Sequence, residues 1–259
     1  PYRVYGDAGR VLVCISGAKQ PMSAWQSVIG YFHRQYRVVV FDIPGLGRAK
    51  ILSGGPSIEM EEQLAVVPAL VQQVGVHQSE QGIIAGASWG AVLAAAYCER
   101  FPEHFDQAVL GSFGTKANPV LNAVIEQVQT LIDAGRAKDI APMMIEKFGQ
   151  YIPDTLKKQI RVQFDNMSDE QFRAFYEHSL LVTEMEDLNR YLDLTRIRAN
   201  TLGIMGQYDT IMDLFETKKA AAKIPNSQYY VHKGVGHFLH WEDDAVLKIY
   251  EEFFENGIV

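Results

Sequence analysis

Residues 82–101 read GIIAGASWGAVLAAAYCERF, and this stretch decides the fold. The apolar run at 82–85 predicts a strand, and the alanine-rich run at 89–101 predicts a helix. Between them, residues 86–90 form a G-x-S-x-G pentapeptide, which is typical of a nucleophilic serine on a sharp strand-to-helix turn. The positive end of the helix then lies next to Ser88, where it favours a developing negative charge. Ser88 is therefore the candidate nucleophile, and the alternative is an ordinary glycine-rich turn.

Short apolar runs alternate with helical patterns on both sides of this stretch. Strands are predicted at residues 11–16, 36–41, 82–85, 108–110, 201–205 and 228–232. Helices are predicted at residues 23–33, 57–74, 89–101, 214–222 and 243–254. Uninterrupted apolar runs are typical of parallel strands covered on both faces, so this alternation predicts an α/β fold with a doubly wound, mostly parallel sheet. Residues 2–5 can add one antiparallel edge strand.

One region, residues 115–199, contains no strand pattern. Apolar side chains recur at helical spacing from Val120 to Ile132, and further helices are predicted at 137–148, 153–164 and 168–184. Ser168 and Gln171 fit a capping box at the start of the last of these helices. We therefore expect one sheet domain, residues 1–114 and 200–259, that carries residues 115–199 as an inserted helical cap.

A serine nucleophile needs a general base and an acid that orients the base. His237 follows the last predicted strand, in the segment GVGHF, and Asp209 follows the strand before it. Both are therefore expected at the carboxyl edge of the sheet, where ligands bind. The chain order Ser88, Asp209, His237 matches the nucleophile–acid–base order of this fold class.

Four neighbouring residues compete for these roles. Asp213 and Glu216 are alternative acids, although both fit the negative charge expected at a helix N-terminus. His232 lies within a predicted strand and His240 in the following segment, so both are expected to be structural or solvated.

At these residues the chain resembles the α/β-hydrolase superfamily, over nearly its whole length. The resemblance implies an α/β-hydrolase fold with an oxyanion loop after the first long parallel strand, where this chain has Ser16-Gly17-Ala18 in place of the usual His-Gly-x. It also implies that the backbone N–H groups of Ala18 and Trp89 stabilise the oxyanion. Residues 42–48, DIPGLGR, resemble the superfamily's Asp-x-x-Gly-x-Gly turn, whose role is structural.

Three segments resemble a narrower group of enzymes. ASWG at 87–90, FGQYIP at 148–153 and GHFL at 236–239 resemble the synthases of the rhamnolipid lipid precursor and the 3-hydroxyacyl-carrier-protein transacylases. That resemblance implies transfer of a 3-hydroxyacyl group from an acyl-carrier-protein or coenzyme A thioester. SWG at 88–90 with GQYD at 206–209 is also similar to proline iminopeptidases, although their Gly/Pro-rich oxyanion loop is missing here.

These residues predict a serine enzyme that forms an acyl-enzyme from a carboxylic ester or thioester. Ser88 attacks the carbonyl, His237 takes the proton, and Asp209 holds the imidazole in the required tautomer. If water takes the acyl group the enzyme is a hydrolase, and if an alcohol or thiol takes it the enzyme is an acyltransferase. A peptidase and a non-catalytic ligand receptor on the same fold are the remaining alternatives. No cofactor and no metal ion are expected.

The predicted cap is rich in apolar side chains, which suit a hydrophobic acyl group. The candidate pocket residues are Met143, Met144, Phe148, Tyr151, Phe172 and Phe175. The alternative is that most of them only pack the cap onto the sheet domain. Lys157, Lys158 and Arg161 form a short basic cluster, which either binds a phosphate of a carrier protein or coenzyme A or simply faces solvent.

Composition narrows the class of protein. The 259 residues are 47% hydrophobic and 21% charged, which excludes a disordered chain, and the net charge of −7 provides no basic surface for nucleic acid. No run approaches the ~18 apolar residues of a membrane span. The two cysteines, Cys14 and Cys98, lie in apolar runs, so we expect no disulfide and a reducing, cytoplasmic location. The oligomeric state stays open.

Overall fold

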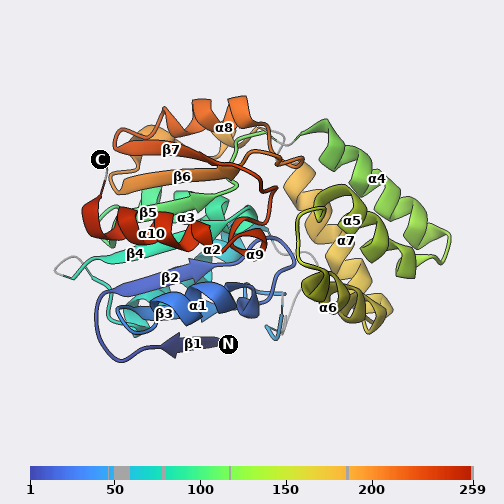
Figure 1. Ribbon diagram of the computed structural model, residues 1–259, viewed down its shortest axis with the longest axis horizontal. Coiled ribbons are helices and arrows are strands. Elements are labelled where there is room, and N and C mark those ends of the chain that lie inside the picture. Colours follow the sequence, from blue (N-terminus) through green and yellow to red (C-terminus); the bar gives the residue numbers. More distant parts are fainter. Residues whose placement is uncertain (46, 50–58, 78–79, 117, 185–186, 258–259) are drawn as a thin grey trace.

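A seven-stranded sheet runs through the centre of the protein (Figure 1). The structure is a computed structural model and describes residues 1–45, 47–49, 59–77, 80–116, 118–184 and 187–257. The strands are β1 (Tyr2–Tyr5), β2 (Val11–Ile15), β3 (Arg37–Phe41), β4 (Gly82–Ala87), β5 (Phe105–Gly111), β6 (Asn200–Gly206) and β7 (Ser227–His232). They lie in the order β1-β3-β2-β4-β5-β6-β7, and only the β1–β3 pair among these described strands is antiparallel. The doubly wound parallel sheet and the antiparallel edge strand are confirmed.

Helices cover both faces of this sheet because its inner strands are apolar on both sides. Leu12 and Cys14 of β2 pack with α1 (Gln26–Phe32) and α10 (Ala245–Asn256). Val13 and Ile15, which point to the opposite face, pack with α2 (Met60–Gln73), α3 (Trp89–Arg100) and α8 (Leu214–Ala221). The core is therefore two apolar layers, one on each side of the sheet.

Several boundaries differ from those predicted. A 3₁₀ turn (Met22–Trp25) precedes α1, and the predicted start of α2 at residues 57–58 lies outside the described residues. The helix predicted at 243–254 begins later, at Ala245, and is preceded by the short helix α9 (Leu239–Glu242). Four residues of helix are too few to leave a periodic pattern in the sequence.

Between β5 and β6 the chain forms four longer helices: α4 (Pro119–Asp133), α5 (Ile140–Phe148), α6 (Asp154–Asp165) and α7 (Asp169–Glu184). They lie together beyond the carboxyl ends of the parallel strands (Figure 1). Their shared core includes Val124, Ile140 and Phe172. Ser168 and Gln171 exchange the two hydrogen bonds of the predicted capping box, at 2.8 and 3.3 Å. Among the described helices, none combines the length and the apolar character that are needed to cross a membrane.

The turn after β3 has the structural role that the sequence predicts for its aspartate. The buried Asp42 carboxylate accepts hydrogen bonds from the N–H groups of Met22 (2.7 Å) and Arg48 (2.8 Å). Gly47 has a φ of +56°, and a Cβ added there would lie 2.4 Å from the Asp42 carboxylate. A glycine is therefore required at this position for the carboxylate to hold the turn.

Candidate active site

Ser88 lies on a strained turn between β4 and α3. Its φ of 53° and ψ of −119° are rarely adopted by residues other than glycine, and its N–H donates to Gly111 O at 2.8 Å. The flanking glycines make this turn sterically allowed. A Cβ on Gly86 would lie 2.3 Å from Gly90 O, and a Cβ on Gly90 would lie 2.1 Å from Ile15 O. The turn presents Ser88 at the carboxyl edge of the sheet, on the wall of a cavity.

His237 and Asp209 form a buried hydrogen-bonded pair. Nδ1 of His237 lies 2.8 Å from Oδ2 of Asp209, and their side chains are 4% and 0% exposed. The other carboxylate oxygen, Oδ1, accepts hydrogen bonds from the N–H groups of Ile211 (2.8 Å) and Met212 (3.0 Å). Since a carboxylate only accepts, it favours the tautomer with the proton on Nδ1, which leaves Nε2 as a proton acceptor.

Ser88 and His237 share the walls of two adjacent cavities. The larger cavity extends toward α4 and α5, and the smaller one toward Leu239 and Trp241. Within the described part of the chain, Ser88 Oγ makes no hydrogen bond, so its side chain is not committed to a structural partner. A substrate carbonyl group held between Ser88 and His237 therefore has one cavity on each side of it.

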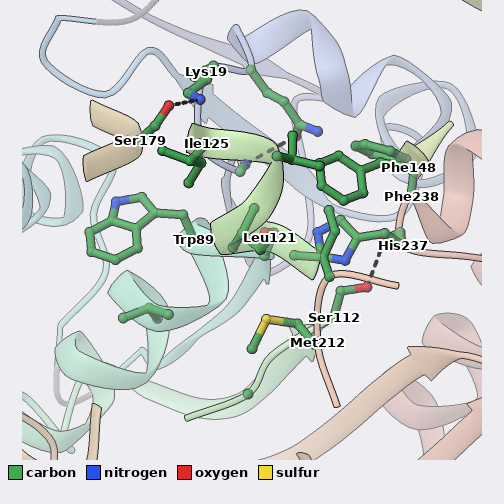
Figure 2. A pocket seen from close by; sticks show the side chains of 18 of the residues that line it. Lys19, Trp89, Ser112, Leu121, Ile125, Phe148, Ser179, Met212, His237 and Phe238 are labelled. Atoms are coloured by element: carbon green, nitrogen blue, oxygen red, sulfur yellow. Dashed lines mark hydrogen bonds between the residues drawn. The ribbon is translucent and has the colours of Figure 1, made fainter. Parts of the chain in front are cut away.

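Two further side chains hold the loop of His237 in place. Ser112 Oγ donates to the carbonyl of His237 at 2.7 Å (Figure 2). The carboxylate of Glu242, on α9, accepts hydrogen bonds from the N–H groups of Gly236 and, at 3.2 Å, Phe238. Burial raises the pKa of Glu242, although these two donors and His237 act in the opposite direction. Neither Ser112 nor Glu242 was predicted from the sequence, because neither belongs to a local motif.

The two N–H groups predicted to stabilise an oxyanion belong to residues that line the larger cavity. Within the described residues, neither the N–H of Ala18 nor that of Trp89 donates a hydrogen bond to the protein. Trp89 opens α3, where a backbone N–H has no acceptor in its own helix. Its indole is fixed by a 2.7 Å hydrogen bond to Gln63 Oε1. Both backbone donors are therefore available to a ligand.

The competing acids and histidines have other partners. Asp213 caps α8 by accepting from the N–H groups of Phe215 and Glu216, at 2.8 and 2.9 Å, as expected for charge at a helix N-terminus. Nε2 of His232 lies 2.8 Å from Asp243. His240 is buried and stacks on Trp25 with ring centroids 5.0 Å apart.

The six candidate pocket residues separate into three groups. Met144 and Phe148, one turn apart on α5, line the larger cavity. Met143, Phe172 and Phe175 are buried in the core shared by α4, α5 and α7 and are not among the described lining residues. Tyr151 is 40% exposed and stacks on Tyr208 with centroids 5.2 Å apart. Helical spacing shows that each helix has an apolar face. It does not show which of the side chains on that face point toward the sheet.

One residue of the predicted basic cluster has local partners. In the basic cluster, Lys157 Nζ donates to Gln150 O at 3.1 Å and lies 3.6 Å from Asp154. Cys14 and Cys98 are free and buried, and burial raises the pKa of both thiols. No group of three or more metal-binding side chains occurs among the described residues.

Comparison with known proteins identifies the family. The sequence profile of the alpha/beta hydrolase fold matches residues 10–244. The chain belongs to this family. It is 22% identical over 249 residues to an (R)-3-hydroxydecanoyl-ACP:CoA transacylase of Pseudomonas putida, which covers 93% of this chain and 83% of the relative. It is 24% identical over 253 residues to 2-hydroxy-6-oxononadienedioate/2-hydroxy-6-oxononatrienedioate hydrolase 1 of the same species, covering 93% and 86%.

A solved structure has the same architecture. MGS-M2, an alpha/beta hydrolase enzyme from a deep-sea metagenome library of the Medee basin, superposes with a TM-score of 0.83 at 18% identity, over 100% of this chain and 95% of that one. The two relatives compared with this alpha/beta hydrolase family member are thus one transacylase and one hydrolase.

Proposed function

We propose that this alpha/beta hydrolase family member is a serine enzyme that cleaves an ester or thioester of a hydrophobic acyl group through an acyl-enzyme. One observation carries the proposal: the buried Asp209–His237 pair opens onto the same cavities as Ser88, whose strained turn leaves its hydroxyl without a protein partner among the described residues. A buried acid–base pair next to an uncommitted serine is the arrangement that nucleophilic catalysis requires.

In the proposed reaction, Ser88 Oγ attacks the carbonyl carbon while its proton passes to Nε2 of His237. Asp209 stabilises the resulting imidazolium, and the N–H groups of Ala18 and Trp89 bind the oxyanion. His237 then returns the proton to the leaving alcohol or thiol, and the acyl group stays on Ser88. Water, activated by His237, attacks the acyl-enzyme and regenerates Ser88.

Acyl transfer is the second candidate function. The two cavities that meet at Ser88 and His237 support it, because one can hold the acyl group while the other admits an acceptor. The transacylase relative points to an acyl-carrier protein or coenzyme A as the source or acceptor of the acyl group. In both reactions residues 115–199 would act as a cap whose α4 and α5 line the acyl cavity.

Covalent labelling tests the nucleophile. A fluorophosphonate probe is expected to label the wild-type protein and not Ser88→Ala. Thr115→Val is the matched control, because Thr115 carries another hydroxyl on the wall of the larger cavity, and this variant is expected to be labelled like the wild type. Equal labelling of the wild type and Ser88→Ala would contradict the assignment.

Product analysis separates the two reactions. The protein is incubated with acyl-CoA, acyl-carrier-protein and simple ester substrates, with and without an alcohol or thiol acceptor, and the products are identified by mass spectrometry. A free acid as the main product supports hydrolysis, whereas a new ester or thioester supports transfer.

A further inference from the structure

The larger cavity carries positive charge on its wall without negative charge to balance it. Its described lining residues include two lysines, Lys19 and Lys116, and no aspartate or glutamate. This contrasts with the chain as a whole, whose net charge is −7. Lys116 is exposed to solvent, whereas Lys19 is only partly exposed. The charge of Lys116 is therefore screened by water, whereas the charge of Lys19 acts mainly inside the cavity.

Lys19 follows the predicted oxyanion loop and reaches α7 of the helical region. Its ammonium group donates to Ser179 Oγ (Figure 2) and lies 3.6 Å from the centroid of the Phe175 ring. The Ser179 hydroxyl donates its own proton to Phe175 O at 2.9 Å, so it acts as an acceptor toward the lysine. These contacts use one or two of the three ammonium donors, and at least one donor is left for a ligand.

Within the described part of the chain, Lys19 forms no ion pair with an aspartate or glutamate. Burial without a counter-ion lowers the pKa of Lys19 to about 7. The neighbouring His178 does not compensate the charge, because burial and then the Lys19 charge lower its pKa to about 4 and keep it neutral.

His178, the residue before Ser179 on α7, is a second polar group near Lys19, although it is not among the described residues that line the cavity. It is 8% exposed, and neither of its ring nitrogens has a hydrogen-bond partner among the described residues. Its ring lies edge-on to Trp89, with centroids 5.9 Å apart. A lysine without a counter-ion is costly in an apolar environment unless a ligand supplies the missing negative charge.

We propose that Lys19, with Ser179 beside it on the cavity wall, forms a subsite that binds a carboxylate on the acyl group of the substrate. The inference rests on the proposed function and refines it: the preferred substrates are half-esters or half-thioesters of dicarboxylic acids. The apolar wall made by Leu121, Ile125 and Met144 packs against the chain between the two carbonyl groups. Lys19 then discriminates between an anionic and a neutral end of that chain.

The competing explanation is purely structural. Lys19 connects the oxyanion loop to α7, so its removal could displace the loop and slow the reaction with every substrate. The two roles differ in one measurable respect: only a subsite makes the effect of the substitution depend on the charge of the substrate.

The kinetic test therefore uses pairs of substrates. Monobenzyl esters of the C5–C9 dicarboxylic acids are compared with benzyl alkanoates of the same carbon number, and benzyl alcohol is quantified by chromatography. At the best chain length, Lys19→Met is expected to lower kcat/KM for the acidic ester by about 10- to 100-fold and for the neutral ester by less than about threefold. Ser179→Ala is expected to cause a smaller loss with the same preference.

Lys219→Met is the matched control, because Lys219 also lies over a phenylalanine ring, at 4.2 Å from the centroid of Phe215, but does not line the cavity. It is expected to leave both rates unchanged. An equal loss for the acidic and neutral esters in Lys19→Met assigns Lys19 the structural role and overturns the proposal, and so does the absence of any loss.

A binding measurement separates failure of the subsite from failure of the proposed function. If the wild type neither cleaves esters nor reacts with the fluorophosphonate, the proposed function is wrong. The subsite is then tested by calorimetry with C5–C9 dicarboxylates and their diamides. Tighter binding of a dicarboxylate that is lost in Lys19→Met supports the subsite, whereas equal binding of acid and amide, or no binding of either, overturns it.

Discussion

At the scale of single residues, the role of Asp209 depends on the partner of each carboxylate oxygen. Oδ2 contacts His237, while Oδ1 is held by the N–H groups of Ile211 and Met212, so the carboxylate cannot rotate freely. In Asp209→Asn an amide N–H can face Nδ1 and favour the wrong tautomer of His237. Under the proposed mechanism we expect kcat to fall by about 10²- to 10⁴-fold, measured on the best ester substrate.

Asp213→Asn provides the comparison for this substitution. Asp213 lies four residues further along the chain and caps α8, and asparagine caps helices about as well as aspartate. Its kcat is expected to stay within about threefold of the wild type. The assignment of the acid would be wrong if Asp213→Asn abolished activity while Asp209→Asn retained it.

At the scale of secondary-structure elements, the close approach of α3 to β2 positions Ser88. A Cβ on Gly90 would lie 2.1 Å from Ile15 O and 2.5 Å from Ser16 O, both of which are backbone atoms. Gly90→Ala must therefore push α3 away from the sheet, and we expect it to lower the free energy of unfolding in urea by at least about 2 kcal/mol.

Gly30→Ala tests the opposite situation in another helix. Gly30 is exposed within α1, and an added Cβ would meet nothing within 4 Å. The same substitution is expected to raise the free energy of unfolding by about 0.5–1 kcal/mol, because alanine favours the helix. Similar effects at both positions would show that the contact between α3 and β2 does not restrict residue 90.

The elements also show what the sequence can predict. Parallel strands buried on both faces are unbroken apolar runs, so β2, β3, β4 and β6 were predictable. The adjacent carboxyl ends of β6 and β7 brought Asp209 and His237 together as expected. On α5, Met144 and Phe148 line the cavity while the adjacent Met143 faces the helical core. That difference depends on how the helix docks against the sheet, which periodicity alone does not specify.

At the scale of the whole molecule, properties set by tertiary contacts were not predictable from composition. The net charge of −7 gave no sign of a cavity lined by two lysines and no acid among its described residues. The same is true of Ser112, which reaches the His237 loop from the end of β5. Its contact joins two segments that meet only in the folded chain.

Burial of histidines makes the stability of the whole fold depend on pH. Burial lowers the pKa of His240 from 6.5 to about 4, although its hydrogen bond to Ala24 O acts in the opposite direction. Between these two values the unfolded chain binds a proton that the folded chain does not, so the free energy of unfolding falls as the pH falls. Above pH 6.5 the contribution is fully present, and below pH 4 it does not decrease further.

The effect of this single histidine can be measured by urea unfolding at several pH values. From pH 7.5 to pH 5 we expect His240 to account for a loss of about 2 kcal/mol in the free energy of unfolding. In His240→Phe the new ring can still stack on Trp25 but does not titrate. The free energy of unfolding of this variant should therefore fall by about 2 kcal/mol less than that of the wild type over the same pH range. An identical pH dependence in the variant and the wild type would mean that His240 gains its proton equally in the folded and the unfolded chain.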